Sequence, residues 1–221
     1  MARTVDPERH AARRMLVIDA GLTCFAELGY DGATTALICR RAGIGSGTFF
    51  HYFPTKASLL LAILRLGTEE TAQWFAAEEG RTDAASVLRD WVEHTADQVT
   101  DPRLPGFVRA VGAVMTEPDV AAALAADEQA QRAGLDAWVR RAQSSGEVRT
   151  DLAAPALTSW IVLVLDGYLG RLAADASFTA SEQRGTLVET VDRLLAPGPE
   201  ASSSTRTGAP ADRSSSATGG R

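Results

Sequence analysis

The chain has 221 residues, enough for one or two domains with a substantial buried core. Its 45% of apolar and 23% of charged residues are typical of a globular protein and exclude a disordered or fibrous chain. The net charge of −6 argues at first against a nucleic-acid partner. However, residues 1–56 carry seven cations and five anions, so the excess of negative charge lies in the residues after them. The two cysteines, Cys24 and Cys39, lie in apolar helical patterns and form no disulfide framework. With no signal segment and no run of about 18 apolar residues, we expect a cytoplasmic protein without a membrane partner.

The N-terminal part of the chain is predicted to be a polar arm followed by helices. Residues 1–9 are polar and include Pro7, which predicts a mobile arm. Apolar residues then recur at spacings of three and four, as on one face of a helix, and Gly29 marks the first helix end. Thr34 or Thr35 can cap the second helix. The helices predicted here span residues 10–28, 35–42, 46–52 and 56–79.

The remainder of the chain is also predicted to be helical. Residues 84–195 contain four prolines and no alternating strand pattern of useful length. Five further helices are predicted at residues 84–100, 104–115, 118–144, 154–175 and 181–195. Residues 197–221 are mostly Ser, Thr, Gly, Pro and Ala, which bury too little apolar surface to fold, so we predict a disordered tail. The sequence therefore predicts an all-α protein of about nine helices, with an N-terminal unit at residues 10–56 and a C-terminal helical unit at residues 57–196.

Residues 35–52 have the pattern of a helix-turn-helix, in which two short helices are joined by a turn that contains glycine. Gly43 can adopt the positive φ that a sharp reversal requires, because it has no Cβ to clash. Ile44 is placed to fill the space between the two helices. The other side chains of this small predicted core are Phe25, Leu37, Ile38 and Phe49.

The third predicted helix is suited to a DNA groove. Its length of about 10 Å fits end-on into a major groove about 12 Å wide. Its exposed face is predicted to present Ser46, Thr48, His51 and Tyr52, whose hydroxyl, imidazole and aromatic groups can contact phosphates and base edges. Lys56 begins the next helix, where its ammonium group and the free N–H groups favour a phosphate.

Four arginines near this motif have more than one interpretation. Arg13 and Arg14 either hold phosphates or cover an exposed helix face, and we expect one of Arg40 and Arg41 to reach the DNA backbone while the other is solvated. His51 is interpreted as a DNA-facing residue and not as a catalytic base, because neither of the other two histidines has cysteines or acidic residues nearby at ligand spacing.

The stretch from Gly29 to Lys56 resembles the N-terminal signature of the tetracycline-repressor (TetR) family, which reads roughly GY…TT…IA..AGVS.GTLY.YF.SK. Here the chain reads GY…TT…ICRRAGIGSGTFFHYFPTK. The match covers about the first 60 residues and is specific in order and spacing. After these residues, the chain resembles the family in two respects only. One is the number of helices, and the other is the segment at residues 146–152, which precedes an apolar helix ending near residues 165–167.

This resemblance implies a homodimer of all-helical subunits, whose two heads enter successive major grooves of a palindromic DNA operator. In the family, the positions that match Thr34, Thr48, His51, Tyr52 and Lys56 commonly contact DNA. The full set of predicted DNA-binding residues is Thr34, Thr35, Gly45, Ser46, Thr48, Phe50, His51, Tyr52 and Lys56.

Three residues depart from the family pattern. Cys39 stands where alanine is usual, which is a tolerable change in a core. Gly45 stands where a serine usually caps the third helix, and Ser46 offers an alternative cap one residue later. Phe50 stands where a tyrosine usually offers its hydroxyl to a phosphate, so that backbone contact is missing while the docking of the helix is not affected.

The large apolar side chains of the C-terminal helices can form either a core or the lining of a ligand cavity. The candidates for a cavity that binds a small hydrophobic or amphipathic effector are Trp91, His94, Phe107, Val111, Met115, Trp138, Trp160 and Val164. The last two predicted helices carry more apolar surface than one subunit core requires, and the family uses its last two long helices as a four-helix dimer seam. The residues predicted for this seam are Leu157, Ile161, Leu165, Tyr168, Leu187, Val191 and Leu194.

These patterns predict a DNA-binding transcriptional regulator, most simply a repressor that a ligand releases from its operator. A helical enzyme or carrier with a vestigial head is the alternative from another class, and an activator would differ only in the position of its operator. The sequence shows no nucleophile–base pair, carboxylate dyad or metal-ligand cluster. Its closely spaced glycines lack the dinucleotide-binding pattern. We therefore predict no catalysis, metal or cofactor.

Overall fold

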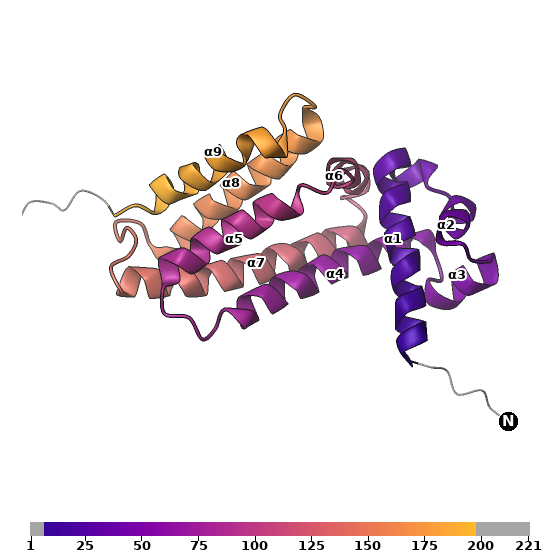
Figure 1. The fold of residues 1–221 in the computed structure, drawn as a ribbon, viewed down its shortest axis with the longest axis horizontal. Helices are drawn as coiled ribbons and strands as arrows, with labels where there is room; N and C mark the ends of the chain where they lie inside the picture. The colour runs from indigo at the N-terminus through magenta and orange to yellow at the C-terminus, as the bar shows by residue number, and fades with distance from the viewer. Residues whose placement is uncertain (1–6, 198–221) are drawn as a thin grey trace, which may run out of the picture.

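The computed structural model describes residues 7–197, which form helices joined by turns (Figure 1). The helices are α1 (Pro7–Gly32), α2 (Thr35–Ala42), α3 (Ser46–Tyr52), α4 (Lys56–Ala77), α5 (Ala84–Gln98), α6 (Leu104–Gly112), α7 (Pro118–Ser144), α8 (Ala154–Ala174) and α9 (Ala180–Leu195). Residues 7–197 contain no strand, so the predicted all-α class with about nine helices is confirmed.

The predicted arm and tail fall largely outside the described residues. Residues 7–9 of the predicted arm belong to α1, which begins at Pro7 and not at residue 10, because proline is tolerated in the first turn of a helix. The rest of the arm lies outside the described residues, as does the predicted tail after Pro197.

The helix ends are set by local signals in the sequence. Gly29 has a φ of 71°, which interrupts α1 as expected of a glycine that ends a regular helix, and one further turn follows to Gly32. The helix α4 ends at Ala77 instead of residue 79, and α6 ends at Gly112 instead of residue 115. The two-residue difference for α4 is ordinary at helix ends, which fray by one or two residues, and that for α6 is one residue larger, since residues 113–116 form turns.

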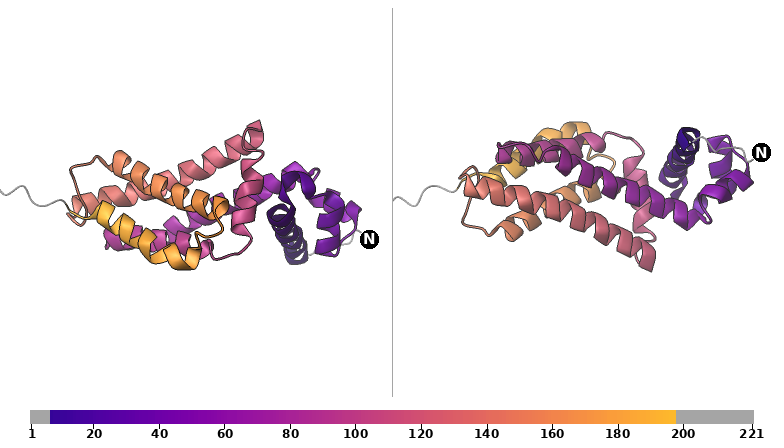
Figure 2. Two further views of the ribbon diagram at one scale, coloured as in Figure 1. Left: turned by 90° about the horizontal axis from the view of Figure 1, so that it is seen from above. Right: turned by 90° about the horizontal axis from the view of Figure 1, so that it is seen from below.

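The molecule is elongated, with a small head at one end and a longer body (Figures 1 and 2). The head consists of α1, α2 and α3, and the body consists of the helices from α4 to α9. The helix α4 begins at the head and continues along the body, whereas α6 lies across the boundary next to α1 (Figure 1). The predicted division at residues 56 and 57 stays a prediction, and it falls at the start of this shared helix α4.

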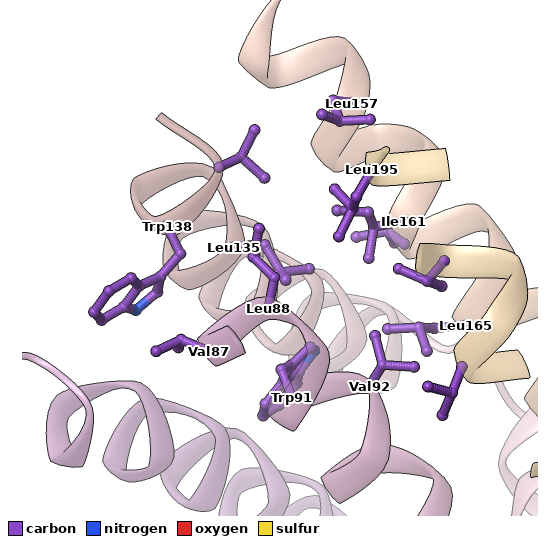
Figure 3. Close-up of a cluster of buried hydrophobic side chains, with 14 of the residues drawn as sticks. Val87, Leu88, Trp91, Val92, Leu135, Trp138, Leu157, Ile161, Leu165 and Leu195 are labelled. Carbon is purple, nitrogen blue, oxygen red and sulfur yellow. The ribbon is translucent and has the colours of Figure 1, made fainter. Parts of the chain in front are cut away.

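The buried apolar side chains form one cluster in the head and another in the body. In the head, Phe25, Ile38 and Phe49 have no exposed area and Leu37 and Ile44 pack against them, which confirms the small core predicted for the helix-turn-helix. In the body, α5, α7, α8 and α9 meet through large apolar side chains (Figure 3). Members of this body cluster include Val87, Leu88, Val92, Leu135, Leu157, Ile161, Leu165 and Leu195.

Among the described residues, α8 alone has the length and hydropathy of a membrane span, with a mean hydropathy of 1.3 over 18 residues. Its residues nevertheless separate into two faces. Leu157, Ile161 and Leu165 have no exposed area, whereas Trp160 is 52% and Leu163 is 56% exposed. In this fold α8 is a core helix of the body, and its outer apolar face is not covered by any other part of residues 7–197.

The head and the body meet through α6. Phe107 and Val111 of α6 are 7% exposed and belong to the head cluster, together with side chains of α1. Gly106 lies directly against the backbone of α1, since a Cβ at this position would be 2.2 Å from the carbonyl oxygen of Ala26. The backbones of α6 and α1 are therefore in direct contact at this point, with no room for a side chain between them.

Candidate nucleic-acid interface

The turn between α2 and α3 has the geometry that its glycine and threonine pattern predicts. Thr34 caps α2, because its hydroxyl oxygen accepts a hydrogen bond from the N–H of Leu37 at 3.3 Å. Gly43 has φ 64° and ψ 33°, in the left-handed region. The N–H of Ile44 donates to the carbonyl oxygen of Cys39 at 3.0 Å and closes the end of α2. These local bonds determine how α3 leaves α2.

The start of α3 is capped by a glycine. Gly45 is the N-cap, with φ −80° and ψ 158°, and makes no side-chain capping bond. Ser46 is the first residue of the helix and its side chain is exposed, so the cap has not moved to it as the sequence suggested. The helix begins without a serine cap because glycine is only a few tenths of a kcal/mol worse at this position.

The outer face of α3 carries most of the predicted contact residues. Ser46 and His51 are exposed and Phe50 is 52% exposed, whereas Thr48 and Tyr52 are half-buried. The head thus presents a hydroxyl, an imidazole and a phenyl ring on a helix short enough to enter a groove. Thr48 and Tyr52 offer only part of their surface.

This face is supported from α1 by His10, which sequence reasoning did not assign. The centre of the His10 ring lies 4.7 Å from that of Tyr52 and 5.7 Å from that of His51. One turn later, the guanidinium of Arg14 lies 5.3 Å from the ring centre of Phe53. No local pattern predicts these contacts, because they join residues that are far apart in the sequence.

Lys56 has an internal partner in this structure. Its ammonium Nζ donates a hydrogen bond to the carbonyl oxygen of Tyr30 at 2.6 Å and lies 4.2 Å from the centre of the Tyr30 ring. The lysine therefore ties the first turn of α4 to the end of α1. It would have to leave these contacts to reach the phosphate that the sequence analysis assigns to it.

The other cations of the head differ in their availability. Arg41 forms an ion pair with Glu27 at 2.6 Å, and this hydrogen bond lowers the pKa of the Glu27 carboxyl. Arg9, Arg13 and Arg40 are exposed and form no ion pair within residues 7–197. Of the two arginines on α2, Arg40 is therefore the one that remains free for a phosphate.

Five of the predicted ligand-binding residues are scattered. Phe107 and Val111 lie in the head cluster, where they pack against α1 and do not line a space within the body. Met115 is 54% and Trp160 is 52% exposed on the surface. Val164 is half-buried at the edge of the body cluster. These side chains share no common space.

The remaining predicted ligand residues lie in or against the body cluster. Trp91 packs against the rings of Trp74, Phe75 and His94, with ring centres 4.5 to 5.7 Å away. Trp138 is 3% exposed in the same cluster. The indole N–H of Trp91 is buried and has no hydrogen-bond partner among the described residues. Trp74 and Phe75 are additions that the sequence analysis missed, although two adjacent aromatic residues late in a long helix are a visible signal.

The residues predicted for the dimer seam are mostly taken up by the core of the subunit itself. Leu157, Ile161 and Leu165 of α8 have no exposed area, because this face packs against α5, α7 and α9. Tyr168, Leu187 and Val191 are also buried, and Leu194 is half-buried. The apolar surface that remains available on α8 is its opposite face.

Two of the hollows among the described residues lie away from these side chains. One, of about 640 Å³, lies where the head meets the body, between Tyr30, Asp31, Leu61, Glu117 and Asp119 among others. Burial, together with the carboxylates of Asp31 and Glu117, raises the pKa of the Tyr30 hydroxyl. The other hollow, a groove of about 480 Å³, lies between α7 and α8. The described residues contain no group of three or more His, Cys, Asp or Glu placed to hold a metal ion.

Residues 17–63 match the family described as bacterial regulatory proteins, tetR family. The HTH-type transcriptional repressor Rv1474c of Mycobacterium tuberculosis is 32% identical to the chain over 170 residues, which cover 77% of this chain and 87% of that protein. The similarity therefore extends from the head through most of the body.

Solved structures share the same fold. A TetR transcription regulator from Haloarcula marismortui superposes with a TM-score of 0.73 at 19% identity, covering 84% of this chain and 97% of that one. The transcriptional regulator FadR from Bacillus subtilis, solved in complex with stearoyl-CoA, superposes with a TM-score of 0.64 at 18% identity, covering 80% of this chain and 96% of that one. At these identities the likeness concerns the fold alone.

Proposed function

Because the chain belongs to the TetR family of bacterial transcriptional regulators, we propose that it is a repressor that binds a palindromic operator as a homodimer and is released by a small-molecule effector. It acts in the cytoplasm and catalyses no reaction. The observation that carries this proposal is the outer face of α3, where Ser46, Phe50 and His51 are exposed on a short helix beyond a glycine turn.

The proposed homodimer is supported by the uncovered face of α8. Trp160 and Leu163 are 52% and 56% exposed there, and large apolar side chains in one patch are characteristic of a protein interface. Two heads that bind one duplex are expected about 34–36 Å apart, the length of one helical turn of DNA.

The proposed effector is hydrophobic or amphipathic and binds next to the aromatic group of the body. The buried N–H of Trp91, which lacks a partner among the described residues, supports a ligand with a hydrogen-bond acceptor. FadR, whose fold the chain shares, accommodates a fatty-acyl ligand. Release requires the effector to bind the operator-free arrangement more tightly than the operator-bound one. The contact between α6 and α1 offers a direct route for this coupling.

The test is selection of DNA by the full chain from a random duplex library at low salt. We expect an inverted repeat to be enriched, with half-sites one helical turn apart. His51→Ala should weaken binding to that sequence by about 5-fold to 150-fold, since one lost base contact costs roughly 1–3 kcal/mol. Glu79→Gln, on the exposed surface beyond α4, is the matched control. Recovery of no inverted repeat by the unmodified chain would contradict the proposed operator.

A further inference from the structure

Three aromatic rings meet where the first turn of α1 lies against the end of α3 (Figure 1). The centre of the His10 ring is 4.7 Å from that of Tyr52 and 5.7 Å from that of His51, and the rings of His51 and Tyr52 are 5.1 Å apart. Each ring is therefore within contact range of the other two. His10 belongs to α1, whereas His51 and Tyr52 are the last two residues of α3.

The contact between the two helices continues one turn further along α1. Arg14 follows four residues after His10 and so lies on the same stripe of α1. Its guanidinium lies 5.3 Å from the ring centre of Phe53, which comes directly after α3 and is 2% exposed. This stripe of α1 therefore lies along the C-terminal end of α3.

The outer side chains of α3 gain order from this contact. The helix has seven residues, or about two turns, and its inner side chain Phe49 is fully buried in the head cluster. His51 is exposed, and its ring contacts among the described residues are with His10 and Tyr52. A side chain that rotates freely must be immobilised when it meets a base, and this ordering weakens binding. A ring packed against both side chains restricts their rotation before any DNA is bound.

We propose that His10 is a positioning residue of the DNA interface, whose ring holds His51 and Tyr52 in the orientation in which α3 meets base edges. Sequence selectivity then depends on a residue of α1, outside the helix-turn-helix. This inference rests on the proposed operator binding and adds a determinant of its selectivity. The role requires a ring at position 10, and not the hydrogen bonds or the charge of an imidazole.

The test replaces His10 by alanine, which removes the ring, and by phenylalanine, which keeps a ring without a donor, an acceptor or a charge. Fluorescence anisotropy gives the affinity of the full chain for the selected inverted repeat and for duplexes with single changed base pairs. His10→Ala should weaken binding to the repeat by roughly three- to tenfold, the effect of losing one or two aromatic contacts. It should also reduce the penalty for the changed base pairs to which His51→Ala is insensitive. His10→Phe should bind with nearly the affinity and selectivity of the unmodified chain.

The dependence on salt separates positioning from a direct phosphate contact. Loss of a phosphate contact weakens binding to all sequences alike and lowers the slope of log affinity against log salt concentration by about one. Loss of a positioning contact leaves that slope unchanged. The variant carrying both His10→Ala and His51→Ala should lose clearly less affinity than the product of the two separate losses, because both changes remove the same contact.

Leu16→Ala, elsewhere on α1, is the matched control. The Leu16 side chain is 57% exposed and is not a member of the head cluster, so affinity and selectivity should stay as they are. Circular dichroism checks that each variant is folded at the assay temperature. Unchanged selectivity in His10→Ala, a salt slope lower by about one, or a loss in His10→Phe as large as in His10→Ala would overturn the positioning role while leaving the operator intact. An unmodified chain that selects no inverted repeat would overturn the operator binding itself.

Discussion

Gly43 is the residue on which the geometry of the head depends most directly. It has φ 64° and ψ 33°, a conformation that costs a residue with a Cβ roughly 1–2 kcal/mol. Gly47, four residues later, lies inside α3, where a Cβ would meet no atom within 4 Å. Two glycines of one motif therefore serve different purposes: the first permits the turn, and the second only reduces the helix propensity of α3.

Alanine at these two positions should change stability in opposite directions. Gly43→Ala should lower the free energy of unfolding by about 1 kcal/mol, because the left-handed conformation disfavours a Cβ. Gly47→Ala should raise it by about 0.5–1 kcal/mol, because alanine loses less backbone entropy in a helix. Urea unfolding monitored by circular dichroism measures both values. A Gly43→Ala variant as stable as the unmodified chain would show that the turn does not require glycine.

At the scale of elements, the decisive contact is that of α6 with α1. The backbone of α1 lies so close to Gly106 that a Cβ there would be 2.2 Å from the Ala26 carbonyl oxygen. A second link comes from Arg103, just before α6, whose guanidinium pairs with Asp19 of α1 at 2.7 Å. The two helices are thus held both by close packing and by an ion pair across the boundary between head and body.

Gly106→Ala should therefore destabilise the chain by about 1–3 kcal/mol, the usual cost of forcing extra atoms into a packed interior. Gly112→Ala is the control, since it lies at the end of the same helix and a Cβ there would meet nothing within 4 Å. Differential scanning calorimetry gives both melting temperatures. A Gly106→Ala melting temperature equal to that of the control would mean that α6 can move away from α1 without cost.

The elements themselves could be predicted because their signals are local. Thr34 caps α2, and Thr55 forms a reciprocal capping box with Ser58 at the start of α4. Gly29 and Gly43 take the positive φ values expected at helix ends. Such signals depend on residues within one turn of each other, so they can be read from a single sequence. They also locate the short helix α3 on which the proposed DNA contact depends.

At the scale of the whole molecule, the half-buried carboxyl of Asp127 contributes to the dependence of stability on pH. Asp127 of α7 is half-buried in the body, and burial raises its pKa although a hydrogen bond from the Thr68 hydroxyl of α4 acts in the opposite direction. Between the unfolded pKa of about 3.9 and the raised folded pKa, the folded state binds more protons than the unfolded state. The contribution of Asp127 to stability is therefore lost as the pH rises through that window.

Asp127→Asn should remove this loss. We expect the variant to melt at a higher temperature than the unmodified chain at pH 7, with the difference shrinking as the pH falls below about 4, where the carboxyl becomes protonated in the folded and in the unfolded state. Glu79→Gln removes an exposed carboxyl and should leave the pH profile almost unchanged. Thermal melts across this pH range test the idea, and parallel profiles for the Asp127 variant and the unmodified chain would refute it.

What the sequence could not predict is which apolar face meets which partner. Leu157 and Ile161 were assigned to a dimer seam but are buried in their own subunit, while Trp160 between them is exposed. Likewise, Phe107 was assigned to a ligand cavity but joins the head cluster. When a helix has apolar residues on more than one side, nothing in its local sequence shows which side is buried in its own subunit. The choice is made by neighbours that are distant in the sequence.

The position of α6 also bears on attempts to build hybrid regulators. Phe107, Ala110 and Val111 come from the body in sequence but complete the apolar interior of the head. A head transplanted as residues 7–56 would leave that interior open wherever the recipient lacks equivalents of these three side chains and of Leu59, Leu60 and Ile63 of α4. Placing the recombination site after α6 would keep the interior of the transplanted head closed. Redesigning the recipient helices to carry the same apolar side chains, with a glycine at the close contact, would have the same effect.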